Sequence, residues 1–350
     1  MFLHALATAV PPFVVTQRHC WDIARESVAL KRLSRRSQLT LRAILTGDSG
    51  IATRHFALED IAHIFDLSPD ELNNGFRREA PRLAGAALGQ ALAQADLAAD
   101  QLDALLLCTC TGYLCPGVSS YVAESLGLRR DAILNDLVGL GCGAAIPTLR
   151  AASHLLAAQP DAVVACVAVE VSSAAFFLDD DPGVLVSACL FSDGAAATIW
   201  RSRPGPTALR CHGFQSLHLP EKRDRLRFET RDGKLRNLLD RSVPVEAAAA
   251  VATLFAKETA APPDTVLVHP GGRDVLDALS PALPGYSLAT SRAVLAAHGN
   301  MSSPSVLFVL EEHLRHAPSG AGDLWLASFG AGFSAHSCRL TAGGVSTSRA

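Results

Sequence analysis

The sequence is poor in charged residues, and the charges that it has nearly balance. Asp, Glu, Lys and Arg make up 19% of the 350 residues, with 31 basic and 34 acidic side chains, so the formal net charge is -3. A protein that binds nucleic acid or an anionic membrane through a broad electrostatic field needs an excess of positive charge. The composition therefore excludes both classes of partner, and any anionic ligand must be bound by a few local groups.

Signals of export, membrane insertion and metal binding are also missing. Residues 1–15 have no basic segment ahead of an apolar one, and no apolar run reaches the length of a membrane span. The nine cysteines are odd in number and most lie in apolar runs, which is typical of reduced thiols. Cys108, Cys110 and Cys115 cluster, but no second Cys or His pair at zinc spacing accompanies them. We therefore expect a soluble, cytoplasmic, unprocessed protein without a metal.

Hydrophobic residues, by contrast, make up 49% of the chain, and the mean hydropathy is +0.22. That is enough for a large core, and apolar runs alternate with helical patterns as in α/β proteins. The most natural break is Arg-Pro-Gly-Pro at residues 203–206, with a similar rhythm of strands and helices on both sides. We predict an α/β fold of two duplicated halves, residues 1–203 and 204–350.

The patterns place elements along both halves. Strands are predicted at residues 2–10, 102–109, 132–138, 161–171, 195–200, 209–218, 265–269, 323–327 and 334–340. Helices are predicted at residues 16–45, 79–95, 119–126, 144–156, 245–256, 273–279 and 304–316. No helix or strand is predicted for the polar segment at residues 221–240, and residues 328–333 are predicted to form a loop.

The glycine-rich stretch at residues 137–147 carries the first candidate catalytic residue. A predicted strand runs into Gly139 and Gly141, and a predicted helix follows, so Cys142 lies at or near a helix N-terminus. Unpaired N–H groups and the positive end of the helix dipole favour an anion there. Cys142 is therefore a candidate nucleophile in its thiolate form.

Two other interpretations fit the same stretch. Gly139, Gly141 and Ala144 match G-x-G-x-x-A, the weak form of the dinucleotide-binding fingerprint, and Asp161 follows roughly 20 residues later, where a ribose-binding acid is expected. A buried cysteine is also more often a small apolar filler than a nucleophile. To choose among these three interpretations, a candidate base for Cys142 is needed, and the C-terminal half contains one.

His269 and Asn300 are the candidate partners. His269 ends an apolar strand and precedes Pro-Gly-Gly, while Asn300 follows a glycine just before a capped helix. Either residue alone has an ordinary structural explanation, a buried histidine or a turn asparagine. Together with Cys142 they supply a nucleophile, a base and an amide donor, each at the end of a strand or helix.

On these motifs the sequence resembles the type III polyketide synthases, the chalcone synthase-like members of the thiolase superfamily. Gly-Cys-Gly at Cys142, His-Pro-Gly-Gly from His269 and Gly-Asn-Met-Ser-Ser at Asn300 match the Cys-His-Asn triad of that family in the same order, over nearly the whole chain. The resemblance implies a thiolase-like fold, two duplicated halves in αβαβα layers. Residues 110–117 and 177–183 are most similar to the bacterial alkylresorcinol and alkylpyrone synthases, which take long fatty acyl starters.

The resemblance implies an acyltransferase of polyketide biosynthesis. Such an enzyme condenses a long-chain fatty acyl thioester with several malonyl-CoA units by decarboxylative Claisen condensation, and cyclises the chain to an alkylpyrone or alkylresorcinol. Cys142 would hold the acyl group, while His269 and Asn300 would stabilise the enolate. The family implies a homodimer, no cofactor besides its substrates, and an acyl-CoA or acyl-carrier-protein donor. A ketoacyl synthase III-like enzyme, which stops after one condensation, and an NAD-binding oxidoreductase remain the alternatives.

Substrate-binding residues are implied in the same way. Phe191 would be the gatekeeper between the substrate tunnel and the cavity, and Cys110, Cys115, Ala175 and Ser302 align with positions that line the cavity. The family counterpart of Cys115 reaches into the neighbouring subunit. A small side chain at Ala175 would leave room for an alkyl chain to pass.

The sequence also departs from the family pattern. The loop Gly-Phe-Gly-Pro-Gly is Ser-Phe-Gly-Ala-Gly at residues 328–332, and the basic residues that bind coenzyme A phosphates in plant members are not matched around residues 44–48. Asn237 aligns with a second phenylalanine that flanks the gate in plant enzymes. A long alkyl chain or a carrier-protein donor would fit these changes.

Overall fold

The structure is a computed structural model. It describes residues 1–58, 63–205, 208–258, 261–316 and 322–342.

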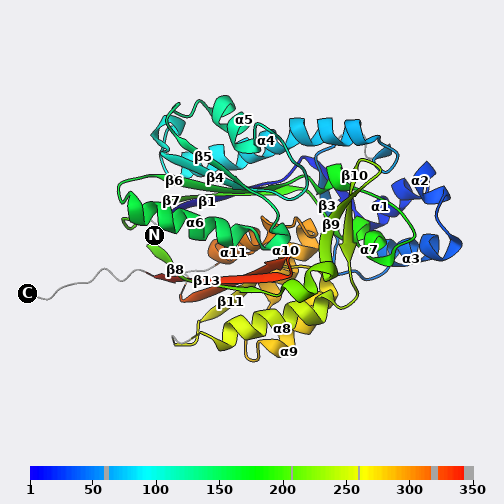
Figure 1. Ribbon diagram of the computed structural model, residues 1–350. Helices are drawn as coiled ribbons and strands as arrows, with labels where there is room; N and C mark the ends of the chain where they lie inside the picture. Colours follow the sequence, from blue (N-terminus) through cyan, green and yellow to red (C-terminus); the bar gives the residue numbers. More distant parts are fainter. Residues whose placement is uncertain (59–62, 206–207, 259–260, 317–321, 343–350) are drawn as a thin grey trace, which may run out of the picture.

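The elements stack in five layers, in the order helix, sheet, helix, sheet, helix (Figure 1). Helices α4 and α5 cover one face of the first group of strands, α6 and α11 lie between the two groups, and α8 and α9 cover the far face of the second. This confirms the predicted αβαβα arrangement. The layer helices are α4 (Pro69–Gln94), α5 (Val118–Leu126), α6 (Ala145–Ala158), α8 (Val243–Ala256), α9 (Arg273–Ala282) and α11 (Ser305–His316).

Nine strands form one continuous sheet in the order β11-β12-β13-β8-β1-β7-β6-β4-β5. The two groups of strands join between β1 and β8, where Phe2 pairs with Arg210. The predicted division between residues 203 and 204 falls between β7 and β8, one strand from each group; as a boundary between domains it stays a prediction. The strands are β1 (Phe2–Ala9), β4 (Ala104–Cys108), β5 (Ile133–Leu137), β6 (Val164–Glu170), β7 (Gly194–Arg201), β8 (Leu209–His218), β11 (Thr265–Val268), β12 (Leu324–Gly330) and β13 (Ser334–Ala342).

The middle layer ties the two halves together. Its apolar cluster contains Ile146 and Leu149 from α6, Leu310 from α11, and strand residues from both groups such as Leu106 and Leu326. Helices α6 and α11 therefore bury side chains against sheet on two sides. Because α6 begins just after Cys142 and α11 begins just after Asn300, this shared core also fixes the relative position of the two candidate residues.

Helix α4 begins at Pro69, where Ser68 and Pro69 indicate a helix start in the sequence, and it continues without a break through the helix predicted at residues 79–95. Ser68 caps it by accepting a hydrogen bond from the Glu71 N–H, and the Glu71 carboxylate accepts one from the Ser68 N–H at 2.7 Å. This capping box, with Pro69 at the first helical position, makes residues 69–94 one helix.

The sequence patterns did not predict several elements, and two of the missed segments, a hairpin and a helix, form walls of the site. The segment left unassigned at residues 221–240 contains the hairpin β9 (Leu226–Arg231) and β10 (Lys234–Leu239). Charged residues occupy strand positions of this hairpin that are usually apolar, because they form ion pairs. Arg236 contacts Asp179 at 2.7 Å and Glu229 at 2.8 Å. Helix α7 (Pro182–Leu190) packs on β10 and is capped by Asp181.

The remaining elements complete the periphery. They are β2 (Phe13–Thr16), α1 (Gln17–Ala24), α2 (Val28–Lys31), α3 (Arg35–Thr46), β3 (Thr53–Phe56), α10 (Ala289–His298) and the short 3-10 turns η2 (Ala99–Gln101), η3 (Gly141–Gly143), η4 (Ser172–Ala175) and η5 (Pro220–Arg225). No helix in the described ranges is long and apolar enough to cross a membrane.

Candidate active site

Cys142 lies in the turn between β5 and α6, as the sequence predicts. Gly139 and Gly141 have φ values of +88° and +55°, which let the chain leave the strand and enter η3. A Cβ on Gly141 would also stand 3.0 Å from the backbone nitrogen of Ala331. The turn therefore needs glycine for its conformation and for close packing against the end of β12.

Strand β12 packs directly against the turn that carries Cys142. It extends through Gly330, so the predicted loop at residues 328–333 is shorter than expected. The Ser328 hydroxyl donates to the Gly143 carbonyl at 3.0 Å, and a Cβ on Gly330 would stand 2.5 Å from the Gly143 nitrogen. The strand and the turn touch backbone to backbone, so no side chain fits between them.

We expect Gly330→Ala to displace the Cys142 turn, because overpacking of this kind forces the backbone to shift. Acylation of Cys142 should slow by at least roughly tenfold, and the melting temperature should fall as in other overpacked sites. The matched control is Gly89→Ala in α4, where a new Cβ has no heavy atom within 4 Å. Acylation by Gly330→Ala at the wild-type rate would show that the close contact does not position Cys142.

His269 follows β11 and is fully buried. Its backbone N–H donates to the Ala327 carbonyl at 2.9 Å, and its ring packs edge-on against Phe329 with 5.1 Å between centroids. Neither ring nitrogen has a hydrogen-bond partner. Burial lowers the pKa of His269 to about 3, so the ring is neutral at pH 7 and can accept a proton.

Asn300 lies between α10 and α11 with its amide orientation fixed. Its Oδ1 accepts from the Ser302 N–H at 2.7 Å, and its Nδ2 donates to the Gly271 carbonyl at 3.2 Å. An amide nitrogen has two N–H groups, so one remains to donate to a ligand. The Asn300 carbonyl also accepts from the Ser192 N–H at 2.9 Å, which links it to the Phe191 turn.

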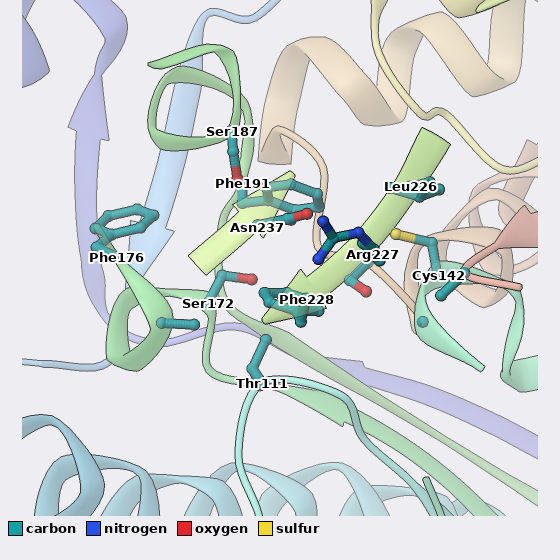
Figure 2. A pocket seen from close by; sticks show the side chains of 14 residues that line it. Thr111, Cys142, Ser172, Phe176, Ser187, Phe191, Leu226, Arg227, Phe228 and Asn237 are labelled. Atoms are coloured by element: carbon teal, nitrogen blue, oxygen red, sulfur yellow. The ribbon is translucent and has the colours of Figure 1, made fainter. Parts of the chain in front are cut away.

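All three candidate residues open into one outer cavity of about 540 Å³. Cys142, Phe191 and Leu226 also line an inner cavity on the other side, which is almost filled and leaves only about 20 Å³ for water-sized molecules. Figure 2 shows the inner cavity, with the Cys142 sulfur facing into it opposite Phe176, Phe191 and Phe228. An acyl group on Cys142 would therefore lie where the two cavities meet.

Glu170 is a buried carboxylate beneath the site that the sequence patterns did not single out. It ends β6 and accepts hydrogen bonds from Cys110 N (2.9 Å), Thr111 N (3.1 Å) and Ser303 Oγ (2.6 Å). The pKa of Glu170 is raised, because burial outweighs the opposing effect of its hydrogen bonds. A Glu that ends a fully apolar strand was the signal available in the sequence.

The protonation state of Cys142 differs from the expected thiolate. Burial is the main cause that raises the pKa of the Cys142 thiol to about 12; the nearby Glu170 charge also raises it, and a hydrogen bond with Ser302 opposes the rise. Desolvation and a like charge therefore outweigh the helix N-terminus. At pH 7 these shifts leave the pair as a neutral thiol and a neutral imidazole.

The predicted cavity residues separate into three groups. Phe191, Ala175 and Ser302 line the inner cavity. Cys110 lies just outside it, with its Sγ 3.3 Å from Ser302 Oγ and 3.3 Å from Glu170 Oε1. Cys115 is exposed and lines a separate surface hollow near β5, so within its own chain it is not a cavity residue.

Comparison with known proteins identifies the family. The family described as "FAE1/Type III polyketide synthase-like protein" matches residues 15–208, and "Chalcone and stilbene synthases, C-terminal domain" matches residues 245–335. The chain is a type III polyketide synthase. It is therefore an acyl-transferring enzyme, which decides against the NAD-binding interpretation of Gly139, Gly141 and Ala144.

Relatives of this type III polyketide synthase cover most of its length. The 1,3,6,8-tetrahydroxynaphthalene synthase of Streptomyces peucetius is 31% identical over 88% of this chain and 84% of the relative. The phloroglucinol synthase of Pseudomonas fluorescens is 27% identical over 74% of this chain and 77% of the relative. The solved structure of the Streptomyces coelicolor tetrahydroxynaphthalene synthase superposes with a TM-score of 0.85 at 26% identity, covering 97% of this chain and 99% of that one.

Other groups of interest lie outside the site. All nine cysteines are free thiols. Asp161, the candidate ribose-binding acid, has a side chain that is 88% exposed and forms an ion pair with Arg203. The described ranges contain no group of three or more His, Cys, Asp or Glu placed to hold a metal.

Proposed function

We propose that this enzyme loads an acyl group onto Cys142 from a coenzyme A thioester, extends it with several malonyl-CoA units by decarboxylative Claisen condensation, and releases a cyclised product. The observation that carries the proposal is the convergence of Cys142, His269 and Asn300 on the outer cavity, directly beside an inner cavity for the product. Each step uses only the two thioesters, so we propose no resident cofactor.

Loading begins from the neutral pair. As the Cys142 sulfur attacks the thioester carbonyl, its proton passes to a ring nitrogen of His269, which has no other partner. The carbon–sulfur bond to coenzyme A then breaks, and the departing thiolate takes up that proton. The result is an acyl-Cys142 and free coenzyme A, with His269 neutral again.

Extension then uses His269 and Asn300 as hydrogen-bond donors. The carbon–carboxylate bond of the malonyl thioester breaks, carbon dioxide leaves, and the electron pair forms an enolate whose oxygen accepts from the His269 ring N–H and the free Asn300 N–H. The enolate carbon attacks the acyl-Cys142 carbonyl, and the Cys142 sulfur leaves as a thiolate that takes up a proton from solvent. The lengthened chain is now a coenzyme A thioester, and it loads onto Cys142 again before the next extension. One such preformed donor in a water-poor site is worth about 3 to 4 kcal/mol in the transition state.

The rim of the outer cavity supports a coenzyme A donor. Arg241 and Arg273 line it, together with Asp48, Asp240 and Asp274. The Arg273 side chain already forms an ion pair, with its Nε 3.4 Å from the Asp274 carboxylate. Arg241 is exposed, and we propose it as the local cation for a coenzyme A phosphate. An acyl-carrier-protein donor is the alternative.

For the starter, the inner cavity favours a short and polar acyl group. It has only about 20 Å³ of free space and includes Thr111, Ser172, Ser187 and Asn237 among its walls. The relatives are named for tetrahydroxynaphthalene and phloroglucinol, small aromatic products without a long alkyl chain. We propose a malonyl or other short starter and a polyhydroxylated aromatic product.

A long-chain fatty acyl starter, giving an alkylpyrone or alkylresorcinol, is the second candidate. The specific observation in its favour is that Ala175 is a small wall residue and that Phe176, beside it, separates the inner cavity from an apolar cavity. That cavity has about 10 Å³ of free space and is lined by Ile23, Leu41, Leu45, Ile64 and Phe65, among others, and by Arg54. Rotation of Phe176 would join the two spaces.

Substitution of Ala175 by Phe decides between these starters. If a long chain passes this wall, we expect Ala175→Phe to abolish turnover of long acyl-CoAs, because each buried methylene contributes about 0.8 kcal/mol that a blocked path would forfeit. Turnover of short acyl-CoAs and the melting temperature should stay near wild type. Equal loss for all chain lengths, with a lower melting temperature, would mean that Ala175 is core packing.

The test of the overall proposal is a product analysis by mass. Purified protein is incubated with malonyl-CoA alone and with acyl-CoAs of several lengths plus malonyl-CoA. We expect a product with several added two-carbon units from malonyl-CoA alone or with a short starter. A product with only one added unit would instead indicate a ketoacyl synthase III-like enzyme.

We also propose a homodimer through the edge strand β5. Strand β5 ends the sheet, and the side chains of Ile133, Leu134 and Val138 are exposed there beside Tyr113. An exposed apolar strand edge pairs readily with a second copy. Cys115 lies in the hollow on this face, in agreement with the implied reach of its counterpart into the neighbouring subunit.

We expect the 36.8 kDa chain to sediment as a dimer and Leu134→Asp to sediment as a monomer, because a charge would be buried in the interface. Leu39→Asp is the control, since Leu39 is also an exposed leucine, on α3, at 48% against 37% for Leu134. A wild-type monomer, or an unchanged Leu134→Asp dimer, would contradict this interface.

A further inference from the structure

Arg54 is a buried cation that the chemistry described above does not use. It lies in β3 and is only 2% exposed, and in the described part of the chain no carboxylate forms an ion pair with it. Its Nη1 donates to the carbonyls of Ala188 at 2.7 Å and Phe191 at 3.0 Å, while its Nε has no partner. Burying a charge without a counter-charge is unfavourable, so we expect a local role for this side chain.

The two carbonyls lie at the C-terminal end of α7, whose last residue is Leu190. The last carbonyls of a helix have no partner within it, and the helix dipole favours a cation there. The Arg54 guanidinium supplies both the donor and the charge. It thereby fixes the end of α7 at Phe191, which lines both cavities.

The chain at the start of β3 also binds the end of α10, the helix that precedes Asn300. The Ala52 N–H donates to the Ala296 carbonyl at 2.8 Å, and the Thr53 hydroxyl donates to the Ala297 carbonyl at 2.6 Å. This short segment therefore supplies partners for the C-terminal carbonyls of two helices at once. Each of these helices leads into a residue of the active site.

Arg54 lies where the two helix ends meet. The Asn300 N–H donates to the Leu190 carbonyl at 3.1 Å, and Phe191 and Asn300 form an isolated β-bridge. Gly299 packs against the aliphatic part of the Arg54 side chain, since a Cβ on Gly299 would stand 3.0 Å from Arg54 Cγ. Arg54 thus contacts the loop of Asn300 with its stem and the end of α7 with its guanidinium.

We propose that Arg54 is a positioning residue, which holds Asn300 where it can donate to the enolate oxygen. The inference rests on the proposed function, in which Asn300 is that donor. Cys142 and His269 are held instead by contacts with β12. Arg54 should therefore matter for decarboxylation and little for loading, because displacing a reacting group by about 1 Å can cost about 100-fold in rate.

The test compares Arg54→Met, which removes the charge at a similar side-chain length, with Arg54→Lys, which keeps it. In Arg54→Met we expect malonyl-CoA decarboxylation to fall at least roughly tenfold and acylation of Cys142 to stay within about threefold of wild type. Arg54→Lys should retain more decarboxylation than Arg54→Met, because an ammonium can still donate to a helix carbonyl. Carbon dioxide release and the intact mass of the protein measure the two steps.

The matched control is Arg339→Met. Arg339 is also a buried arginine, 2% exposed in β13, but it is paired with Asp323. Its loss leaves a carboxylate without its partner, so Arg339→Met should lower the melting temperature. The ratio of decarboxylation to acylation should stay at the wild-type value.

A second test combines Arg54→Met with Asn300→Ala. If Arg54 acts through Asn300, its substitution should slow decarboxylation by less than about twofold once the Asn300 amide is gone, because the effects of coupled residues do not add. A purely structural role would give the same loss in both backgrounds.

Three results would overturn the inference and leave the proposed function intact. They are wild-type decarboxylation in Arg54→Met, equal loss of decarboxylation and acylation in the Arg54 variants, and an undiminished loss in the Asn300→Ala background. If Arg54→Met does not fold, Arg54→Lys carries the same comparisons. Wild-type decarboxylation by Asn300→Ala alone would overturn the inference together with the role of Asn300 in the proposed function.

Discussion

Cys142→Ser should form no acyl-enzyme and no product from any acyl-CoA, while folding as the wild type does. A serine hydroxyl is a far weaker nucleophile unless a base is already bound to it. His269 is neutral, and neither of its ring nitrogens is hydrogen-bonded to the residue at position 142. We expect loading to fall by about three orders of magnitude or more. Release of coenzyme A and the intact mass of the protein measure this directly.

The matched control for that variant is Cys110→Ser. Cys110 is a nearby cysteine with its Sγ 3.3 Å from both Ser302 and Glu170, so the same exchange of sulfur for oxygen is made outside the reacting position. Loading by Cys110→Ser should stay within a few fold of wild type. If Cys110→Ser lost loading and Cys142→Ser kept it, the nucleophile would have been assigned to the wrong thiol.

Asn300→Ala should load Cys142 nearly as fast as the wild type but decarboxylate malonyl-CoA about 100- to 1000-fold more slowly, the effect of removing one oxyanion donor. The amide can donate to the enolate oxygen but cannot accept the thiol proton. Asn300→Asp sharpens the test, because a carboxylate can still accept from the Ser302 N–H but cannot donate. Asn300→Asp should therefore load Cys142 but decarboxylate malonyl-CoA as slowly as Asn300→Ala does. Carbon dioxide release and acyl-enzyme formation are measured separately.

His269→Ala is the reference for the Asn300 variants. It removes both the proton acceptor for Cys142 and one enolate donor, so loading and decarboxylation should both collapse. Loading as slow in Asn300→Ala as in His269→Ala would refute the division of roles between the two residues.

The parts of the site that the sequence could predict are those fixed by neighbours along the chain. Gly139 and Gly141 break the strand before Cys142, His269 ends an apolar strand, and Gly299 precedes Asn300. Each local pattern placed its residue at the end of an element, and the α/β rhythm indicated two duplicated halves. The layered fold in which those ends meet was implied by the resemblance to the type III polyketide synthases. The strand at residues 209–218 was predicted to the residue from such a local pattern.

What the sequence could not predict depends on contacts between distant segments. The raised pKa of Cys142 follows from burial and from Glu170, which is brought beside it by the order of strands in the sheet. The hairpin that carries Asn237 is held by Arg236 and Asp179, a pair separated by almost sixty residues. Strand β9 does alternate Leu226 and Phe228 with charged residues, which was the signal available in the sequence, whereas β10 has no regular alternation. The outward position of Cys115 likewise becomes visible only once β5 is known to be the edge strand.

The central claim is that Cys142, at the junction of the two cavities, carries the acyl group during synthesis. The most direct measurement is peptide mapping by mass after incubation of the wild-type enzyme with an acyl-CoA. The chain has nine free cysteines, and Cys115 is exposed and Cys110 is partly accessible, so the mapping distinguishes acylation of Cys142 from acylation of another thiol. We predict that the acyl group is found on the peptide that contains Cys142 and that malonyl-CoA then removes it as product. An acyl group on any other peptide, or one on Cys142 that malonyl-CoA does not remove, would contradict the account.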